Sequence, residues 1–294
     1  NPTTVTQTIT IDDTTPPVVS APGAITLEAC GTGDINNPLI AGHSGLAYSP
    51  TSTTITLAQF TSEGGTATDN CSIASISYSD AITTAGPCPI VVTRTFLIKD
   101  PCDNPTTVTQ TITIDDTTPP VFTVPADITI CRDNTGIYND DPSATGDVTD
   151  EADNCSTGMN ALYSDNTSNL GSISVAGYIV RTWTLTDNCG NSTTKDQTIW
   201  VQPVPKIAVS VPDTICNGSQ IDFAIDSLVI SRGNVMYDLN ILYPAGITGT
   251  LSNGSYPIAS ISDNLVNSTD THQTVTYTFS PYIQGKPGDP TCHN

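Results

Sequence analysis

The chain contains one stretch twice, letter for letter. Residues 1–17 and residues 104–120 both read NPTTVTQTITIDDTTPP, and a diverged third version, NSTTKDQTIWVQPVP, begins at Asn191. Self-similarity at a spacing of roughly 100 residues is typical of a chain built from tandem modules. This repeat therefore constrains the architecture more than any local pattern does.

Each copy combines a strand pattern with a stop signal. Along the first copy, Val5, Gln7, Ile9 and Ile11 alternate with threonines. Alternation with period two, in a run rich in Thr, Val and Ile, predicts a half-buried β-strand. The DDTTPP that follows cannot extend the strand, because proline has no backbone N–H to donate to a neighbour. We interpret each copy as the last strand of a module and a stiff junction to the next.

The remaining strand patterns define the modules. Residues 1–16 are predicted to be the last strand of a preceding repeat, and 17–116 and 117–203 are predicted to be matching modules. Residues 204–294 form a different module that lacks an obvious closing strand, so we expect it to be truncated and the chain to be a piece of a longer protein. Short strands separated by turn signals predict an all-β fold. We expect tandem immunoglobulin-like β-sandwich modules arranged as an elongated rod.

Matching positions in the two similar modules indicate a shared core. Phe96 and Trp183 correspond and are predicted to be buried, and Arg94 and Arg181 lie on the same strand face. We expect these arginines at the rim, with packed stems and with heads that pair or extend to solvent. Predicted strands cover 24–29, 72–80, 89–100, 105–115, 126–131, 177–189, 197–201, 235–244, 273–283 and two segments within 204–225.

Charge excludes several classes of function. With 8 Lys and Arg against 29 Asp and Glu, the net charge is −21, which argues against nucleic acid and anionic lipid as partners. No apolar run reaches the ~18 residues of a membrane span, so we expect no membrane insertion. The three histidines lie in no metalloprotease or Cys-His motif, and no GxSxG, P-loop or GxGxxG sequence occurs. We expect neither enzymatic activity nor an organic cofactor.

Several motifs resemble a known module type. ATDNC at 67–71, RTWTLTDNCGN at 181–191 and the DDTTPP junctions are similar to hyalin-repeat-like (HYR-like) modules of very large Bacteroidetes surface proteins, including SprB-type gliding adhesins. DTICNGS at 213–219 and the segment 275–292 resemble the PKD-like modules interspersed with them. The resemblance implies secretion to the cell surface by the type IX route, adhesion or gliding motility, and neighbouring repeats of the same chain as partners.

Nine cysteines indicate an oxidising, extracytoplasmic setting. In a sandwich of this kind, Cys71 and Cys102 belong to loops at the N-terminal end of the first module, and Cys30 and Cys88 to the opposite end. We therefore predict Cys71–Cys102, Cys30–Cys88, Cys155–Cys189 and Cys216–Cys292, with Cys131 free. A competing scheme, Cys30–Cys102 with Cys131–Cys189, leaves Cys155 free instead.

Aspartates gather at the same places. The acidic pair of each DDTTPP junction is expected to face aspartates in the loops of the following module, and converging carboxylates repel unless a cation joins them. The sequence predicts Ca²⁺ sites made from Asp12, Asp13, Asp69, Asp100 and Asp103, and from Asp115, Asp116, Asp153 and Asp187. QPVPK at 202–206 has no acidic pair, so we expect no cation there and the loosest junction. Asp-Thr-Thr at 13–15 and 116–118 also resembles a Bacteroidetes O-glycosylation site, on Thr14 and Thr117.

Three functions fit these observations. The first is a structural, adhesive stalk segment, which suits repeats with rigid junctions and no catalytic motif. The second is a carbohydrate- or surface-binding module, which needs exposed aromatic side chains. The third is a strand-donating subunit of a head-to-tail fibre, in which residues 3–12 pair with another molecule. Candidates for the aromatic cluster are Tyr237, Tyr243, Tyr256 and Tyr282.

Overall fold

The structure is a computed structural model that describes residues 3–294, so the first two residues of the predicted strand 1–16 lie outside the described residues. It is 42% strand and 4% helix, which confirms the all-β prediction. The chain divides into two compact units. Unit 1 holds residues 1–121 together with loops 152–159 and 186–193, and unit 2 holds 122–151, 160–185 and 194–294.

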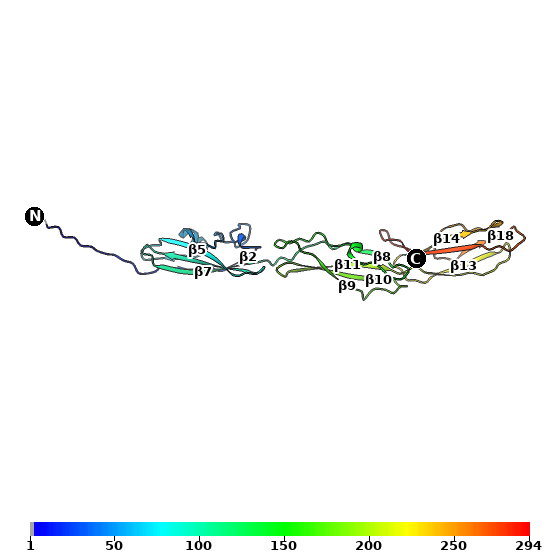
Figure 1. Cartoon of the computed structure of the whole chain (residues 1–294), viewed down its shortest axis with the longest axis horizontal. Coiled ribbons are helices and arrows are strands. Elements are labelled where there is room, and N and C mark those ends of the chain that lie inside the picture. Colours follow the sequence, from blue (N-terminus) through cyan, green and yellow to red (C-terminus); the bar gives the residue numbers. More distant parts are fainter. Residues whose placement is uncertain (1–2) are drawn as a thin grey trace. The chain divides into compact units, whose positions relative to one another are not determined.

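Unit 1 is built on a five-stranded sheet (Figure 1). Its order is β2 (Ile25–Glu28), β7 (Pro105–Asp115), β6 (Ile90–Lys99), β5 (Ser75–Thr84) and β3 (Thr53–Ile55). β2 runs parallel to β7, and the other neighbours are antiparallel. A second, two-stranded sheet pairs β1 (Val18–Ser20) with β4 (Thr66–Thr68). The short helices are η1 (Thr32–Asp34) and α1 (Leu57–Ser62), the latter begun by a capping box on Thr56.

The two sheets of unit 1 enclose the predicted core. Phe96 on β6 is fully buried and packs edge-to-face on Phe60 of α1, with ring centroids 5.0 Å apart. Ala67 of β4 belongs to the same cluster as Ile76 of β5, so the small sheet covers the large one. The alternation of buried residues along β6 follows the pleat, as the sequence pattern predicts.

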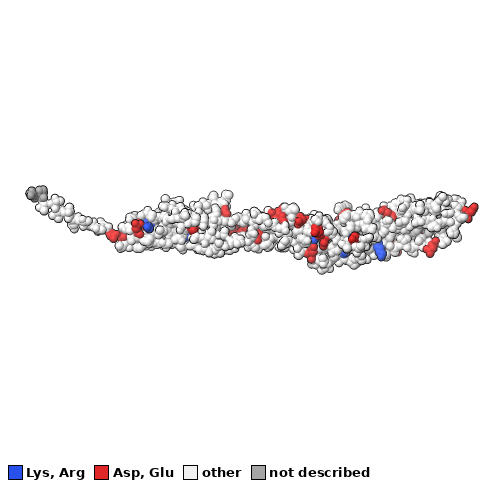
Figure 2. All heavy atoms as spheres, in the orientation of Figure 1, with Lys and Arg blue, Asp and Glu red and all other residues white. Residues whose placement is uncertain are grey.

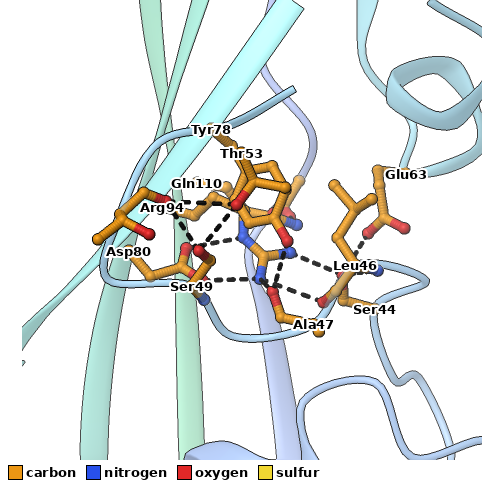
Figure 3. Close-up of polar contacts among 12 residues, drawn as sticks. Ser44, Leu46, Ala47, Ser49, Thr53, Glu63, Tyr78, Asp80, Arg94 and Gln110 are labelled. Atoms are coloured by element: carbon orange, nitrogen blue, oxygen red, sulfur yellow. Dashed lines mark hydrogen bonds and ion pairs between the residues drawn. The ribbon is translucent and has the colours of Figure 1, made fainter. Parts of the chain in front are cut away.

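Arg94 is not at the rim, so that prediction is wrong. Its side chain is fully buried and forms a bidentate ion pair with Asp80, at 2.8 and 2.9 Å (Figure 3). The remaining guanidinium N–H groups donate to Ser44 Oγ and to the carbonyl oxygens of Leu46 and Ala47. A buried charge is tolerated here because each guanidinium nitrogen has a hydrogen-bond partner, and the network fastens the 44–49 loop to the sheet.

Unit 2 begins with a four-stranded sheet of the same design. Its order is β8 (Ile128–Cys131), β11 (Ser192–Gln202), β10 (Gly177–Thr186) and β9 (Leu162–Asn166), with β8 parallel to β11. Helix α2 (Pro142–Thr145) lies in the connection before β9. Trp183 is buried as predicted. Arg181 is buried too and pairs with Asp165, which repeats the Arg94 arrangement and overturns the rim prediction again.

The last module of unit 2 is a separate sandwich of two main sheets, with a core centred on Phe223 and Tyr237. One sheet is β12 (Ile207–Ser210), β13 (Gln220–Ser227) and β17 (Ile261–Asn264); the other is β16 (Gly254–Pro257), β14 (Asn234–Leu242), β19 (Thr276–Gln284) and β20 (Cys292–His293). A small pair joins β15 (Ile247–Thr248) to β18 (Val266–Asn267).

Of the four tyrosines proposed for ligand binding, Tyr237, Tyr243 and Tyr256 pack in this core, and Tyr282 stacks on His293. Tyr237 is fully buried, and Tyr243, Tyr256 and Tyr282 are only partly exposed. Tyr243 donates its hydroxyl to the buried carboxylate of Asp263 at 2.6 Å. The expected cluster of exposed aromatic side chains is therefore not formed by these four residues.

The two identical stretches have different structures. Residues 105–115 form β7 in the centre of a sheet, whereas residues 3–16 run as an extended segment outside every strand (Figure 1). Ile112 and Ile114 on β7 are buried, but their counterparts Ile9 and Ile11 are 74% and 93% exposed. The predicted strand at 1–16 is not a strand among the described residues, because a strand needs a neighbour to accept and donate its hydrogen bonds.

Candidate functional site

The junction that leaves β7 is held by one carboxylate of β2. Glu28 accepts hydrogen bonds from the backbone N–H and the hydroxyl of Thr117, at 2.9 and 2.7 Å, and from the hydroxyl of Thr118 at 2.8 Å. The bonds from Thr117 lower the pKa of Glu28 below its usual value. Parallel pairing of β2 with β7 places Glu28 opposite Asp115, so the strand register itself positions this contact.

Two loops of unit 1, 153–156 and 187–191, present further aspartates to the junction. Asp153 accepts the N–H groups of Cys155 and Ser156 at 2.9 and 2.7 Å, so one of its oxygens is fixed by its own turn. Asp187 is held in the same way by the N–H groups of Cys189 and Asn191, both at 2.8 Å. The Asn191 side chain also donates to the carbonyl oxygen of Asp116, which ties its loop to the junction.

Three carboxylates meet there. Oxygen atoms of Asp116, Asp153 and Asp187 all lie within 4.8 Å of one another. Asp116 is only 3% exposed, and its Oδ2 has no hydrogen-bond partner; Oδ1 of Asp153 is also buried and unpartnered. An unpaired buried carboxylate oxygen is costly, so this geometry demands a positive charge or a proton.

The pKa shifts report the same conflict. Burial raises the pKa of Asp116 above its usual value, and the charges of Asp153 and Asp187 act in the same direction. Burial also acts to raise the pKa of Asp187, but the hydrogen bonds from Asn191, Cys189 and Gly190 outweigh it and hold the value below normal. The ionised form is thus favoured at Asp187 and disfavoured at Asp116 by their surroundings.

The residues fit a hard divalent cation. All available ligand atoms are carboxylate oxygens, which Ca²⁺ and Mg²⁺ prefer and which suit soft metals poorly. Asp116 Oδ2 and Asp153 Oδ1 are free to bind, since no donor occupies them. Ca²⁺ accepts oxygens from irregular loops more readily than Mg²⁺, which demands near-octahedral geometry. The cluster that we call the triaspartate site (Asp116, Asp153, Asp187) thus fits Ca²⁺ best.

The first copy of the junction gathers fewer carboxylates. Asp13 and Asp69 lie together with the thiol of Cys71. Asp13 is partly exposed, and hydrogen bonds from Thr15, Cys71 and Asn70 hold its pKa below the usual value. The thiol donates to Asp13, and this bond, with burial, raises the pKa of Cys71 to about 11.

The structure therefore brings together only some of the nine aspartates predicted to bind Ca²⁺. Asp100 is buried and accepts from Cys102 and Asn104, as Asp187 does from Cys189 and Asn191, but Asp100 belongs to neither cluster among residues 3–294. Asp103 pairs with Lys99 at 3.3 Å instead. Asp12 and Asp115 belong to neither cluster among residues 3–294. Calcium binding itself stays a prediction.

The disulfides differ from every predicted pair. Cys30 bonds Cys155 and Cys88 bonds Cys189, with Cα atoms 5.0 and 5.2 Å apart. The predictions Cys30–Cys88 and Cys155–Cys189 are wrong because they assumed that each module closes its own bridges. The two ends were assigned correctly, but cysteines at one end of a module bond loops of the next repeat.

The remaining cysteines follow the same rule. Cys131, predicted to be free, bonds Cys292, and Cys216–Cys292 is therefore wrong. Cys71, Cys102 and Cys216 are exposed thiols, so Cys71–Cys102 is wrong as well. The competing pairs Cys30–Cys102 and Cys131–Cys189 are also contradicted.

Several contacts hold the module that follows the junction at 202–206. Within unit 2, Val175 bridges in parallel to Ile230. Two residues further on, Arg232 donates to the hydroxyl of Thr129 at 2.8 Å. The guanidinium of Arg232 also lies 4.4 Å from the centre of the Trp200 ring. Together with the Cys131–Cys292 bond, these contacts fasten the last module. One disulfide forms here against two at the joint in unit 1, and the expectation that this junction is the loosest stays a prediction.

The predicted glycosylation sites differ in availability. Thr14 and Thr117 are both exposed, but the hydroxyl of Thr117 donates to Glu28. Acidic side chains dominate the charged residues on the face shown in Figure 2. Within residues 3–294, none of the helices is long and apolar enough to cross a membrane.

Comparison with known proteins finds one clear sequence relative. The chain is 34% identical over 215 residues to hyalin from the sea urchin Lytechinus variegatus, a match that covers 69% of this chain. The chain spans about a third (34%) of the length of that relative. No family model matches the chain.

Solved structures show only a weak overall likeness. Extracellular cadherin domains 1–4 of protocadherin gamma B7 align with 84% of this chain and 72% of that one, at 14% identity and a TM-score of 0.27. Domains EC22–24 of mouse cadherin-23 align with 83% of this chain and 89% of that one, at 12% identity and a TM-score of 0.25. The chain is thus similar in sequence to part of a hyalin.

Proposed function

We propose that the chain is a structural, adhesive stalk segment of a secreted, repetitive bacterial cell-surface adhesin or filament, involved in surface adhesion or gliding motility. One observation carries the stalk role: disulfides fasten the end of each repeat to the next module. Cys30–Cys155 and Cys88–Cys189 do so twice in unit 1, and Cys131–Cys292 does so once in unit 2.

These bonds shorten the covalent path along which tension travels. The path follows the backbone from residue 1 to Cys30 and crosses the disulfide to Cys155. It then follows the backbone back to Cys131, crosses the disulfide to Cys292 and ends at residue 294. With residues 1–30, about 58 of the 294 residues lie on the path, and at ~3.5 Å per residue they extend to roughly 200 Å, against roughly 1,000 Å for the whole chain. Strands β5 to β7 and β9 to β11 of the two repeats lie off this path, which suits a load-bearing segment.

Calcium would complete the joint in unit 1. The triaspartate site holds two unpartnered oxygens between the junction and the two loops, so a bound Ca²⁺ would stiffen their connection. Secretion, cell-surface location by the type IX route and the absence of enzymatic activity belong to the same proposal. They are supported by the resemblance to HYR-like and PKD-like modules, by the disulfides and by the net charge of −21.

Single-molecule force spectroscopy tests the stalk proposal. The whole chain is pulled from its two ends, first oxidised and then after reduction. We expect the oxidised chain to lengthen by no more than roughly 200 Å before it detaches, and the reduced chain to show unfolding steps that total several times more. Equal total lengthening in both states would contradict the proposal, since the modules would then bear the load themselves.

A strand-donating subunit remains a second candidate, because residues 3–12 are exposed and carry the apolar face of a β7-type strand. Val5 is 87% exposed on that face. Donation of this strand to another molecule would give a head-to-tail fibre. Mass measurement in solution separates the two candidates: a monomer over the whole concentration range contradicts strand donation, and concentration-dependent chains of copies support it.

A further inference from the structure

Unit 1 contains two versions of the same docking end. We call the loops 69–72 and 100–104 the first leading end, and the loops 153–156 and 187–191 the second. In the first, Asn104 donates to the carbonyl oxygen of Asp13 at 2.8 Å, and in the second Asn191 donates to that of Asp116 at 2.8 Å. The two ends therefore hold the incoming DDTTPP junction with the same contacts.

Other contacts repeat as well. Thr106 donates to the carbonyl oxygen of Pro17, as Thr193 does to that of Pro120. Asp69 accepts from the N–H of Cys71 at 2.8 Å, as Asp153 accepts from that of Cys155 at 2.9 Å. Cys71 and Cys102 of the first leading end thus correspond to Cys155 and Cys189 of the second.

The partners of the second leading end are known from the structure. Cys155 and Cys189 bond Cys30 and Cys88, which sit at what we call the trailing end of the preceding module. At each joint, the trailing end and the leading end contribute the same number of bonded cysteines. In unit 1, two cysteines of the trailing end bond two of the leading end. In unit 2 the trailing position that corresponds to Cys88 is Val175, and there a single bond forms, through Cys131.

The first leading end has the two cysteines but no module bonded to them. Both thiols are exposed, and the junction that enters this end continues backwards into the extended segment 3–12. That segment repeats the sequence of β7. In the 17–116 module, β7 pairs with β2, and Cys30 follows β2 in the sequence. A module docked here would use 3–12 as its β7 and would place its own trailing cysteines beside Cys71 and Cys102.

We propose that Cys71, Cys102 and the segment 3–12 form an acceptor for a second module of the 17–116 type, which becomes bonded through disulfides equivalent to Cys30–Cys71 and Cys88–Cys102. The occupant is identified by its chemistry: a sandwich with two thiols at the positions of Cys30 and Cys88 and an open β7 position. The proposal rests on the equivalence of the two leading ends and is independent of the adhesive role.

Each bond requires an oxidant, for which we take a small disulfide of the glutathione class. One protein thiolate attacks oxidised glutathione and releases one glutathione thiol. The second protein thiolate attacks the resulting mixed disulfide and releases the other. One protein disulfide therefore consumes one glutathione disulfide, and the two glutathione thiols formed carry away the two protons.

The exact repeat allows a direct test. Because residues 104–116 equal residues 1–13, a chain of residues 1–116 followed by residues 14–294 duplicates the first module without altering any junction sequence. The natural and the duplicated chain are refolded in a glutathione buffer, alkylated, digested without reduction and mapped by mass spectrometry. We expect the duplicated chain to yield two disulfide-linked peptide pairs that the natural chain does not yield, one joining Cys30 to Cys71 and one joining Cys88 to Cys102. The number of alkylated thiols should not increase.

Two variants assign these bonds to the joint. Cys71→Ser in the second copy should abolish the 30–71 peptide and leave 88–102, whereas Cys71→Ser in the first copy should change neither. Retention of the 30–155 and 88–189 peptides shows that the rest of the chain has folded. Four additional alkylated thiols, bonds 30–88 or 71–102, or a 30–71 peptide that survives the second-copy variant would each overturn the proposal.

Discussion

Two identical acidic junctions lie in opposite environments. Asp13 and Asp116 occupy the same place in DDTTPP, yet Asp13 is partly exposed with a lowered pKa and Asp116 is 3% exposed with a raised one. At Asp13 the hydrogen bond from Thr15 dominates, and at Asp116 burial dominates. The side chains are the same, so the docked trailing end accounts for the difference.

That comparison shows how the joint makes the site. Disulfides from Cys30 and Cys88 hold the loops 153–156 and 187–191 against the junction, and Glu28 holds the junction from the other side. At the free leading end Asp100 is buried but Asp13 is partly exposed, whereas at the joint Asp116 and Asp187 are both buried. The candidate cation site is a consequence of joining two repeats, and neither repeat carries it alone.

The largest expected difference between the two ends concerns the disulfides. Cys189→Ser should lower the free energy of unfolding by roughly 2–5 kcal/mol, because it removes a bond that closes a long loop. Cys102→Ser, the matched change at the first leading end, removes no bond and should leave stability unchanged. Denaturant unfolding of both variants measures this, and equal losses would contradict the pairing.

Calcium should distinguish Asp116 from Asp13 next. In saturating Ca²⁺, at about 100 times the dissociation constant, the natural chain should gain roughly 2.7 kcal/mol over the chain in chelator. Asp116→Asn should remove most of this gain, whereas Asp13→Asn should keep it. Thermal melts with Ca²⁺ and with EDTA decide the matter; natural-chain melts that coincide in the two buffers would refute the triaspartate site.

The pH dependence in chelator should have opposite signs at the two junctions. The folded pKa of Asp116 is raised, so the native chain binds more protons there and loses stability as pH rises from the normal aspartate value through the raised one. The folded pKa of Asp13 is lowered, so its contribution is present above the normal value and disappears as pH falls.

Asp116→Asn should accordingly stabilise the metal-free chain near neutral pH and destabilise the Ca²⁺-loaded one. Unfolding curves at several pH values, with and without EDTA, test this reversal. A variant that destabilises the chain equally in both buffers would show that Asp116 acts only through packing.

The smallest expected effect is at Glu28. Glu28→Gln weakens the bonds to Thr117 and Thr118 at an exposed position, so we expect a loss of about 1 kcal/mol or less. Because the pKa of Glu28 is lowered, this loss should be seen above its normal range and vanish in acid. Chemical unfolding at neutral and acid pH measures it, and a loss that is independent of pH would contradict an ionic role.

The strands were predictable from local pattern, and the joints were not. The 105–115 prediction coincides with β7, and the buried positions of β6 follow its alternation. The pairing of Cys30 with Cys155 depends on contact between residues 125 apart, which no local period encodes. The two ends that meet at a joint contribute equal numbers of bonded cysteines: two and two at the first joint, one and one at the second. This match was a usable signal, but we missed it by assuming that each module closes its own bridges.

The cation site shows the same division. Convergence of Asp116, Asp153 and Asp187 followed from topology, because the junction precedes loops at the near end of the next repeat. Which aspartates take part did not follow: Asp100 and Asp187 have matching turns, yet only Asp187 joins a cluster. Likewise, Arg94 was misplaced because its partner Asp80 is known only from the strand register.

Disulfide mapping of the natural chain tests the central claim most directly. Non-reducing digestion after alkylation should yield the peptides 30–155, 88–189 and 131–292, with Cys71, Cys102 and Cys216 alkylated. Peptides linked 71–102 or 155–189 would mean that each repeat closes its own bridges, and the account of covalent joints between repeats would then be wrong.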